Sequence, residues 1–305
     1  MASIGTSGLT LPNHLAAGVW SKGQKGSAIA QLSGAEPQQF GVTQYMTLTA
    51  PPKAEIVGEA AQKSQSNPTF APVTSAVRKA QVTMRFNQEV QWADEDYQLG
   101  VLATMADAAA VALSRALDLV AIHGINPLTG AALSGSPAKL LDTTASVEVT
   151  ASSKPDADIE TAVGLALTNG VTPNGIAFDP AFAFSLSTMR DTTGRKIYPD
   201  LGFGQNLSDF EGLNAAVSDT VSAPEATVAG GAYATTNPHV KAIVGDWRAF
   251  RWGVQRQIPI ETILYGDPDG SGDLKRNNQI ALRAEVVFGV GILSTSAFAK
   301  VIDAA

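Results

Sequence analysis

Two strand-like segments, Val42 to Val57 and Phe70 to Val90, flank a polar stretch that reads VGEAAQKSQSNPTF and contains Lys63. Apolar and polar residues alternate within the second segment, so the pattern predicts the two arms of one long hairpin. A two-stranded hairpin is marginally stable alone in water, and this one has few large apolar residues to fold back on itself. We therefore expect the hairpin to lie on another surface, and a neighbouring subunit is a candidate.

The rest of the chain has the composition of a globular protein that mixes helices and strands. Of its 305 residues, 45% are hydrophobic and 16% are charged, enough to bury one or two cores. Acidic residues at 94–96 and apolar residues spaced by three and four predict a helix from Asp94 to His123. Helices and a short strand alternate after Lys154, and the region after Ala249 reads as strands. The expected fold class is α+β.

Charge and composition exclude several classes of protein. The formal net charge is −7 with scattered Lys and Arg, so phosphate-driven nucleic-acid binding is not expected. The absence of cysteine removes disulfides and thiol catalysis and suits a reducing cytoplasm, and no secretory signal is recognisable. The apolar segment from Leu99 to Ile122 carries Asp107, Arg115 and Asp118, which are costly in hydrocarbon, so we expect a buried helix and no membrane association.

Motifs for enzyme chemistry are mostly missing. The sequence has no phosphate-binding GxxxxGK[ST], no HExxH and no GxSxG, and its glycine pairs lack the third glycine of a dinucleotide-binding motif. The three histidines are far apart in sequence, beside turn or arm residues: His14, His123 and His239. We expect no cofactor and no metal.

One acidic turn has a superficial likeness to a calcium loop. Asp267, Asp269 and Asp273 are spaced as early ligands of such a loop, but its twelfth position is Asn278 and not an acidic residue. A solvated hairpin turn is the better interpretation.

Three stretches carry a resemblance to a known family. They are the hairpin tip VGEAAQKSQSNPTF, the run PNGIAFDPAFAFSLSTMRDTTGRKIY, and the pair GDWRAFRWGVQRQIPIETI and NNQIALRAEVVFGVGI. In their order and spacing the chain resembles the major capsid proteins of tailed bacteriophages, which have the Hong Kong 97-type shell fold. No single motif is specific, but the series covers nearly the whole chain.

The resemblance implies a division of the chain into the parts of that fold. It implies an N-terminal arm at 1–40, an extended hairpin loop at 41–90, a peripheral domain at 91–154 and 243–305 that includes a spine helix at 94–123, and an axial domain at 155–242. It also implies that the loop from Tyr198 to Asn206 points to the axis of a capsomer.

Some family members weld their shells covalently, and the residues of that reaction have counterparts here. The resemblance implies that Lys63 attacks the side chain of Asn278 on an adjacent subunit, with Glu285 taking up protons. Burial at a subunit contact would favour the neutral amine that such an attack needs. The alternative stays open that Lys63 only solubilises a loop tip, that Asn278 only belongs to a turn, and that Glu285 only pairs with Arg283.

The resemblance also implies partners. We expect a major capsid protein that self-assembles into hexamers and pentamers around double-stranded DNA, without sequence-specific binding, as part of a virion assembled in the bacterial cytoplasm. A separate scaffolding protein, a portal protein and a decoration or cement protein are the other expected partners. Apart from single-turnover cross-linking, no enzyme activity is expected.

Two other classes remain as alternatives. An encapsulin-type compartment shares the shell fold and would enclose a cargo enzyme instead of DNA. A soluble α/β enzyme is the more remote alternative, because no nucleophile, base and orienting group form a recognisable set.

Overall fold

The computed structural model describes residues 26–97, 101–135, 138–150, 154–203, 207–224, 233 and 237–304. Its helices are α1 (Ile29–Leu32), α2 (Gln88–Tyr97), α3 (Val101–Asp118), α4 (Pro155–Thr168) and α5 (Pro180–Thr188), with a π-helical turn η2 (Leu119–His123) and 3-10 turns η3 (Leu140–Asp142), η4 (Pro199–Leu201), η5 (Trp247–Ala249) and η6 (Thr295–Ala297). Its strands are β1 (Gln44–Ala50), β2 (Thr69–Thr74), β3 (Ala76–Asn87), β4 (Ser146–Val149), β5 (Gly175–Phe178), β6 (Asp209–Phe210), β7 (Leu213–Val217), β8 (Val240–Gly245), β9 (Phe250–Ile263), β10 (Gln279–Ile292) and β11 (Phe298–Asp303). The α+β class expected from the sequence is confirmed.

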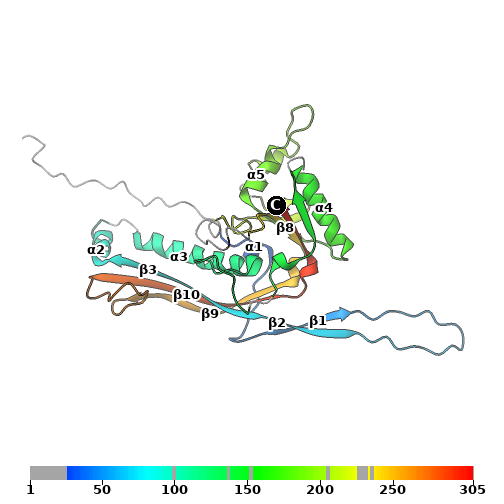
Figure 1. Cartoon of the computed structure of the whole chain (residues 1–305), viewed down its shortest axis with the longest axis horizontal. Helices are drawn as coiled ribbons and strands as arrows, with labels where there is room; N and C mark the ends of the chain where they lie inside the picture. The colour runs from blue at the N-terminus through cyan, green and yellow to red at the C-terminus, as the bar shows by residue number, and fades with distance from the viewer. Residues whose placement is uncertain are drawn as a thin grey trace, which may run out of the picture.

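The described strands form a hairpin and two larger sheets. The hairpin pairs β1 with β2, a three-stranded sheet has the order β3-β10-β9, and a six-stranded sheet has the order β4-β11-β8-β5-β7-β6. Figure 1 shows α3 along one face of the three-stranded sheet, α2 at one end of that sheet, and the hairpin projecting from the opposite end. Helices α4 and α5 pack with the six-stranded sheet to form the other part of the body.

The predicted hairpin is shorter than the sequence pattern suggested. Its first strand ends at Ala50 instead of Val57, and its second arm divides at Ser75. Beyond Ser75, strand β3 leaves the hairpin and pairs antiparallel with β10 from Ala76 to Asn87. The long β10 offers β3 a continuous run of partners, which the short first arm cannot supply.

The predicted spine helix differs at its start. Helix begins at Gln88, directly after β3, and not at Asp94. It is described as α2 and then α3, and residues 98–100 between them lie outside the described residues. The end at His123 is as predicted, because Gly124 adopts a left-handed conformation (φ 68°) that stops the helix. No described helix is both long and apolar enough to cross a lipid bilayer.

The six-stranded sheet draws strands from both of the predicted domains. Strands β5 and β7 come from the range predicted as axial, whereas β4 and β11 come from the ranges predicted as peripheral. Strand β11 pairs parallel with β4 and antiparallel with β8, so it lies between them, next to the edge strand β4 of this sheet. The division into a peripheral domain at 91–154 and 243–305 and an axial domain at 155–242 stays a prediction, and β4 and β11 of the predicted peripheral ranges share a sheet with strands of the predicted axial range.

The described end of the predicted arm belongs to the core. Ala28 and Ile29 are fully buried among the core residues of the body. The buried carboxylate of Asp118, at the end of α3, accepts hydrogen bonds from the backbone N–H groups of Ala28 (2.7 Å) and Ile29 (3.2 Å) and from the hydroxyls of Ser27 and Thr220. Burial nevertheless raises the pKa of this carboxyl group. Residues 1–25 of the predicted arm lie outside the described residues.

Candidate functional site

The hairpin presents an unprotected apolar face. Leu48 pairs with Phe70 and Met46 pairs with Pro72 across the two strands, so all four side chains lie on one face. Met46 is 66% exposed and Phe70 is 58% exposed, although neither would be expected on a free surface. We call these four residues the apolar face of the hairpin. Together with the projecting position of the hairpin, this face indicates contact with another molecule.

Residues 36–41, which lead into β1 and are called the root of the hairpin below, pass closely over two glycines of the three-stranded sheet. Gly253 and Gly289 are directly paired in β9 and β10. A Cβ atom at Gly253 would overlap the carbonyl oxygen of Glu36, and one at Gly289 would overlap the side-chain oxygen of Gln38. The chain can cross this sheet closely only because both positions lack a side chain.

Hydrogen bonds hold the root in this position. The Glu36 N–H donates to the carbonyl of Trp252 (2.8 Å). The side-chain amide of Gln255 donates to the Gly41 carbonyl (2.8 Å) and accepts from the Gly41 N–H (3.1 Å). Glu36 also forms an ion pair with Arg251. The direction in which the hairpin leaves the body is therefore fixed at its base.

Lys63 lies in the loop between β1 and β2, at the far end of the hairpin. Its side chain is exposed. Beside it, the hydroxyl and the backbone N–H of Ser64 (2.9 Å for the N–H) both donate to the carboxylate of Glu55. The hydroxyl, and to a lesser extent the N–H, lower the pKa of this carboxyl group. The loop places Lys63 away from the body of the subunit (Figure 1).

Asn278 forms the end of a helical turn that precedes β10. The Gln279 N–H donates to the carbonyl of Leu274 (2.9 Å) and the Asn278 N–H to the carbonyl of Lys275 (3.4 Å), the pattern of a Schellman motif. Asn278 has the left-handed conformation that this motif requires (φ 53°), which asparagine adopts more readily than most residues. Asn278 therefore lies in a turn that favours asparagine, which gives a structural reason for this residue beside the proposed chemical one.

The side-chain amide of Asn278 also has a partner that the sequence did not suggest. Its Nδ2 donates to Oε1 of Glu89 over 2.9 Å. Glu89 lies in the first turn of α2, where the helix dipole favours a carboxylate. The two residues are 189 positions apart in sequence, and they meet because β3 and β10 pair up to Asn87 and Gln279.

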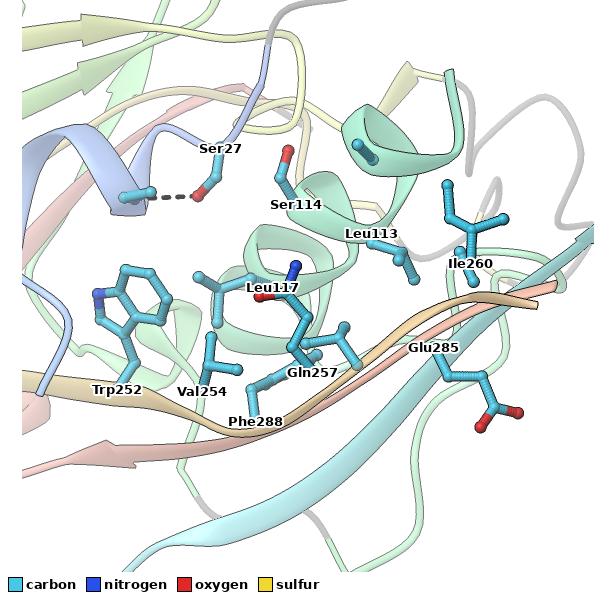
Figure 2. A pocket seen from close by; sticks show the side chains of 14 residues that line it. Ser27, Leu113, Ser114, Leu117, Trp252, Val254, Gln257, Ile260, Glu285 and Phe288 are labelled. Atoms are coloured by element: carbon cyan, nitrogen blue, oxygen red, sulfur yellow. Dashed lines mark hydrogen bonds between the residues drawn. The ribbon is translucent and has the colours of Figure 1, made fainter. Parts of the chain in front are cut away.

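Glu285 is separate from this pair. It lies seven residues further along β10, about 20 Å away at the usual rise of a strand. Its carboxylate forms an ion pair with Lys79 (2.7 Å) and not with Arg283, and it is mostly covered. Figure 2 shows this carboxylate directed away from the neighbouring groove.

The structure therefore does not bring the three predicted site residues together within one chain. Asn278 directly precedes β10, Glu285 lies seven residues further along within it, and the loop that carries Lys63 lies beyond the opposite end of the sheet from α2 (Figure 1). A reaction among them requires residues from more than one copy of the chain.

The acidic turn is organised by an arginine. The guanidinium of Arg85, on β3, binds the carboxylates of Asp267 (3.1 Å) and Asp269 and the carbonyl of Gly272 (2.9 Å). Arg85 lowers the pKa of Asp269. Among the described residues no group of three acidic or histidine side chains is arranged to hold a metal ion.

The described histidines have structural surroundings. His123 is buried, its Nε2 donates to the carbonyl of Thr220 (3.0 Å), and its Nδ1 accepts from the hydroxyl of Tyr233. Burial lowers the pKa of His123 to about 4. His239 has a left-handed backbone conformation (φ 51°) directly before β8, and His14 lies outside the described residues.

The loop predicted to face the capsomer axis is described as far as Phe203. The Phe203 ring is 69% exposed, stacks on Phe184 with 6.5 Å between ring centres, and lies under the ammonium group of Lys196. Residues 204–206 lie outside the described residues. This tip therefore presents aromatic surface to solvent.

A groove of about 350 Å³ runs between α3 and the strands β9 and β10. Figure 2 shows Leu113 and Leu117 on the helix side and Trp252, Val254 and Phe288 on the strand side. The lining is mostly apolar and lacks the converging polar groups of a substrate or cofactor site. The groove therefore gives no support to the alternative of a soluble α/β enzyme.

Comparison with known proteins is consistent with this geometry. The family model described as "Phage capsid family" matches residues 7–302. No curated protein matches this chain. A solved structure from Mycobacterium phage Ogopogo is 63% identical, covers 99% of this chain and 100% of its own, and superposes with a TM-score of 0.91.

Two further structures extend the likeness. One from Gordonia phage Cozz is 31% identical, with 97% of this chain and 92% of that chain covered and a TM-score of 0.82. The structure titled "Capsid of native GTA particle computed with C5 symmetry" is 12% identical, with 97% and 96% covered and a TM-score of 0.66, and shows the fold alone. Because the family match spans almost the whole chain, this chain belongs to the phage capsid family, as a shell protein with the Hong Kong 97-type fold of tailed phages.

Proposed function

We propose that this capsid protein assembles into hexamers and pentamers that form the icosahedral head shell around the double-stranded DNA of a tailed bacteriophage. The observation that carries this proposal is the hairpin, which is anchored firmly at its root and leaves its apolar face uncovered. A hairpin of this kind gains stability by lying on a neighbouring subunit. The family assignment favours a phage head over an encapsulin-type compartment.

The apolar face can supply a useful binding energy at each contact. Burying a large apolar side chain contributes about 1.5 to 3 kcal/mol, so Met46, Leu48 and Phe70 together offer several kcal/mol before the cost of ordering is subtracted. In a closed shell the same contact recurs at every subunit. Small contributions at one hairpin therefore have a large effect on assembly.

The test is a substitution on this face. We expect Phe70→Ser to lower the yield of closed shells in electron micrographs and sedimentation, while the subunit stays folded by circular dichroism. Thr47→Ser, on the opposite face of β1 where Thr47 pairs regularly with Ala71, is the control and should leave the yield unchanged. Normal shells from Phe70→Ser would contradict the proposed role of the face.

We also propose that the shell is welded by isopeptide bonds between Lys63 of one copy and Asn278 of another. The neutral amine of Lys63 attacks the side-chain carbonyl carbon of Asn278, a new C–N bond forms, and the C–Nδ2 bond breaks with release of ammonia. Glu285 would take the proton that the lysine ammonium loses before the attack, and the extra proton left on the attacking nitrogen after the attack passes to Nδ2. Because Glu285 is about 20 Å from Asn278 of its own chain, it must come from a different copy than Asn278.

The covalent proposal is tested on a reducing, fully denaturing gel of particles from their native source. Bands at multiples of the 31.6 kDa subunit cannot be disulfides, since the chain has no cysteine. We expect such a ladder, and we expect Lys63→Arg, which keeps the charge but not the nucleophile, to remove it. A single subunit band from wild-type particles would leave a shell held by packing alone.

The remaining partners are proposals that follow from the family. They are a separate scaffolding protein, a portal protein, a decoration or cement protein, and packaged DNA bound without sequence preference, with assembly in the bacterial cytoplasm. The exposed tip at Phe203 would lie near the capsomer axis. Uniform shells of correct size from this chain expressed alone would count against a separate scaffolding protein.

A further inference from the structure

The carboxylate beside Asn278 in this structure is Glu89 and not Glu285. Glu89 Oε1 accepts the hydrogen bond from Asn278 Nδ2 at 2.9 Å. Nδ2 is the atom that must leave as ammonia if the side chain of Asn278 reacts with an amine. A group that transfers a proton to the leaving atom has to be within hydrogen-bond distance of it, and Glu89 satisfies this condition.

The position of Glu89 is held by the surrounding backbone. The N–H of Gln88 donates to the carbonyl of Asn278 (3.0 Å), and the side-chain amide of Gln279 donates to the Asn87 side chain (3.0 Å). The start of α2 is therefore tied to the start of β10 on both sides of the pair. Neither partner depends on a long flexible connection to find the other.

The side chain of Asn278 is exposed, and its bond to Glu89 turns the NH₂ group towards α2. Because the residue is exposed, an amine from outside the subunit can approach its side chain. An incoming lysine would meet the carbon, while the leaving nitrogen already faces a carboxylate.

We propose that Glu89 is a catalytic residue of the cross-linking reaction, the one that returns a proton to the leaving nitrogen of Asn278. This inference rests on the proposed cross-link between Lys63 and Asn278. It divides the proton transfers between two carboxylates: Glu285 of another copy takes the first proton from the lysine, and Glu89 handles the second.

The steps balance without any further reactant. Attack by the neutral amine of Lys63 gives a tetrahedral carbon whose new nitrogen carries an extra proton. Glu89 accepts that proton and delivers it to Nδ2, the C–Nδ2 bond breaks, and ammonia leaves. Glu89 ends as the carboxylate with which it began, and the product is one amide bond between two chains.

Glu89→Gln separates proton transfer from positioning. Glutamine keeps a side-chain oxygen that can accept the hydrogen bond from Asn278, but it cannot carry a proton. We expect the rate at which the gel ladder forms to fall about 100-fold or more, the usual contribution of a general acid–base group. Glu89→Asp keeps the carboxylate and should recover part of the rate.

The matched control is Glu148→Gln, which changes an exposed glutamate of β4 in the other sheet and should form the ladder at the wild-type rate. If Glu89→Gln also reaches the wild-type rate, Glu89 is only a structural partner and this inference is overturned, while the cross-link itself stands. If wild-type particles form no ladder, the cross-link and this inference both fall.

A second measurement covers the case in which Glu89→Gln shells do not assemble. Isotope-labelled Glu89→Gln subunits are assembled together with unlabelled wild-type subunits, and the linked peptides are analysed by mass spectrometry. We expect Asn278 peptides in links to come from the unlabelled chains. Equal use of labelled and unlabelled Asn278 would overturn the inference.

Discussion

Replacing Gly253 by alanine is the sharpest test of how the hairpin is held. A Cβ atom there overlaps the carbonyl oxygen of Glu36 and lies 2.9 Å from Cγ of Gln38. The carbonyl is backbone and cannot rotate away as a side chain can. The segment that crosses the sheet must therefore lift.

The cost follows from the bonds that lifting breaks. The Glu36 N–H loses the carbonyl of Trp252, and Gly41 loses both of its bonds to Gln255. At about 1 kcal/mol for each net hydrogen bond, the loss is about 2 to 3 kcal/mol, the range also found for overpacked cores. We expect the free energy of unfolding of dissociated subunits to fall by this amount in a denaturant titration.

Alanine at two other glycines provides the comparison for the cost at Gly253. At Gly289 the added methyl meets the end of the Gln38 side chain, which can move, so the cost of alanine should be smaller than at Gly253. At Gly164, in α4, no atom lies within 4 Å of the added methyl, and alanine should stabilise the helix by about 0.5 to 1 kcal/mol. The reasoning is refuted if Gly253→Ala unfolds at the wild-type midpoint or if Gly289→Ala is the more damaging of the two.

Three further outcomes are expected. Asn278→Gly should keep the unfolding free energy within about 0.5 kcal/mol of wild type, because glycine suits the left-handed position. The same variant should form no gel ladder. A ladder that persists would show that another residue is the acceptor. His123 has a folded pKa of about 4 against about 6.5 when unfolded, so its contribution is fully present above pH 6.5 and is lost as the pH falls towards 4. His123→Gln should therefore reduce the acid loss of unfolding free energy between pH 7 and pH 4 by about 3 kcal/mol, and an unchanged acid loss would contradict this. Arg85→Ala should make the turn at 266–273 the first site of limited proteolysis, whereas Arg276→Ala should not, as mapped by mass spectrometry.

The start of the long helix shows why local patterns misplace boundaries. The acidic residues at 94–96 suggested a helix beginning at Asp94, yet α2 begins at Gln88. No turn separates β3 from α2. The alternation of apolar and polar residues that ends at Phe86 is therefore followed directly by the helix, and no turn residues mark the boundary. The available signal was Asn87, a residue type favoured immediately before a helix.

The placement of β11 shows a different limit. The sequence indicated a strand near the C-terminus, and Phe298–Asp303 is one. Its partners β4 and β8 are distant in sequence, and nothing in a local pattern says which of two sheets a strand joins. For the same reason the sequence did not reveal Glu89, which meets Asn278 only after β3 and β10 have paired.

The anchored root and the apolar face of the hairpin act together in assembly. Docking a flexible segment consumes part of its binding energy in ordering, at about 0.5 to 1.5 kcal/mol for each immobilised side chain. Because the root is already fixed over Gly253 and Gly289, docking onto a neighbour has to order little more than the loop at 51–68. The energy from burying Met46 and Phe70 is then available for subunit contact. A hairpin loosened at its root would carry the same apolar side chains and still assemble poorly, which is why Gly253→Ala and Phe70→Ser should impair shells by different routes.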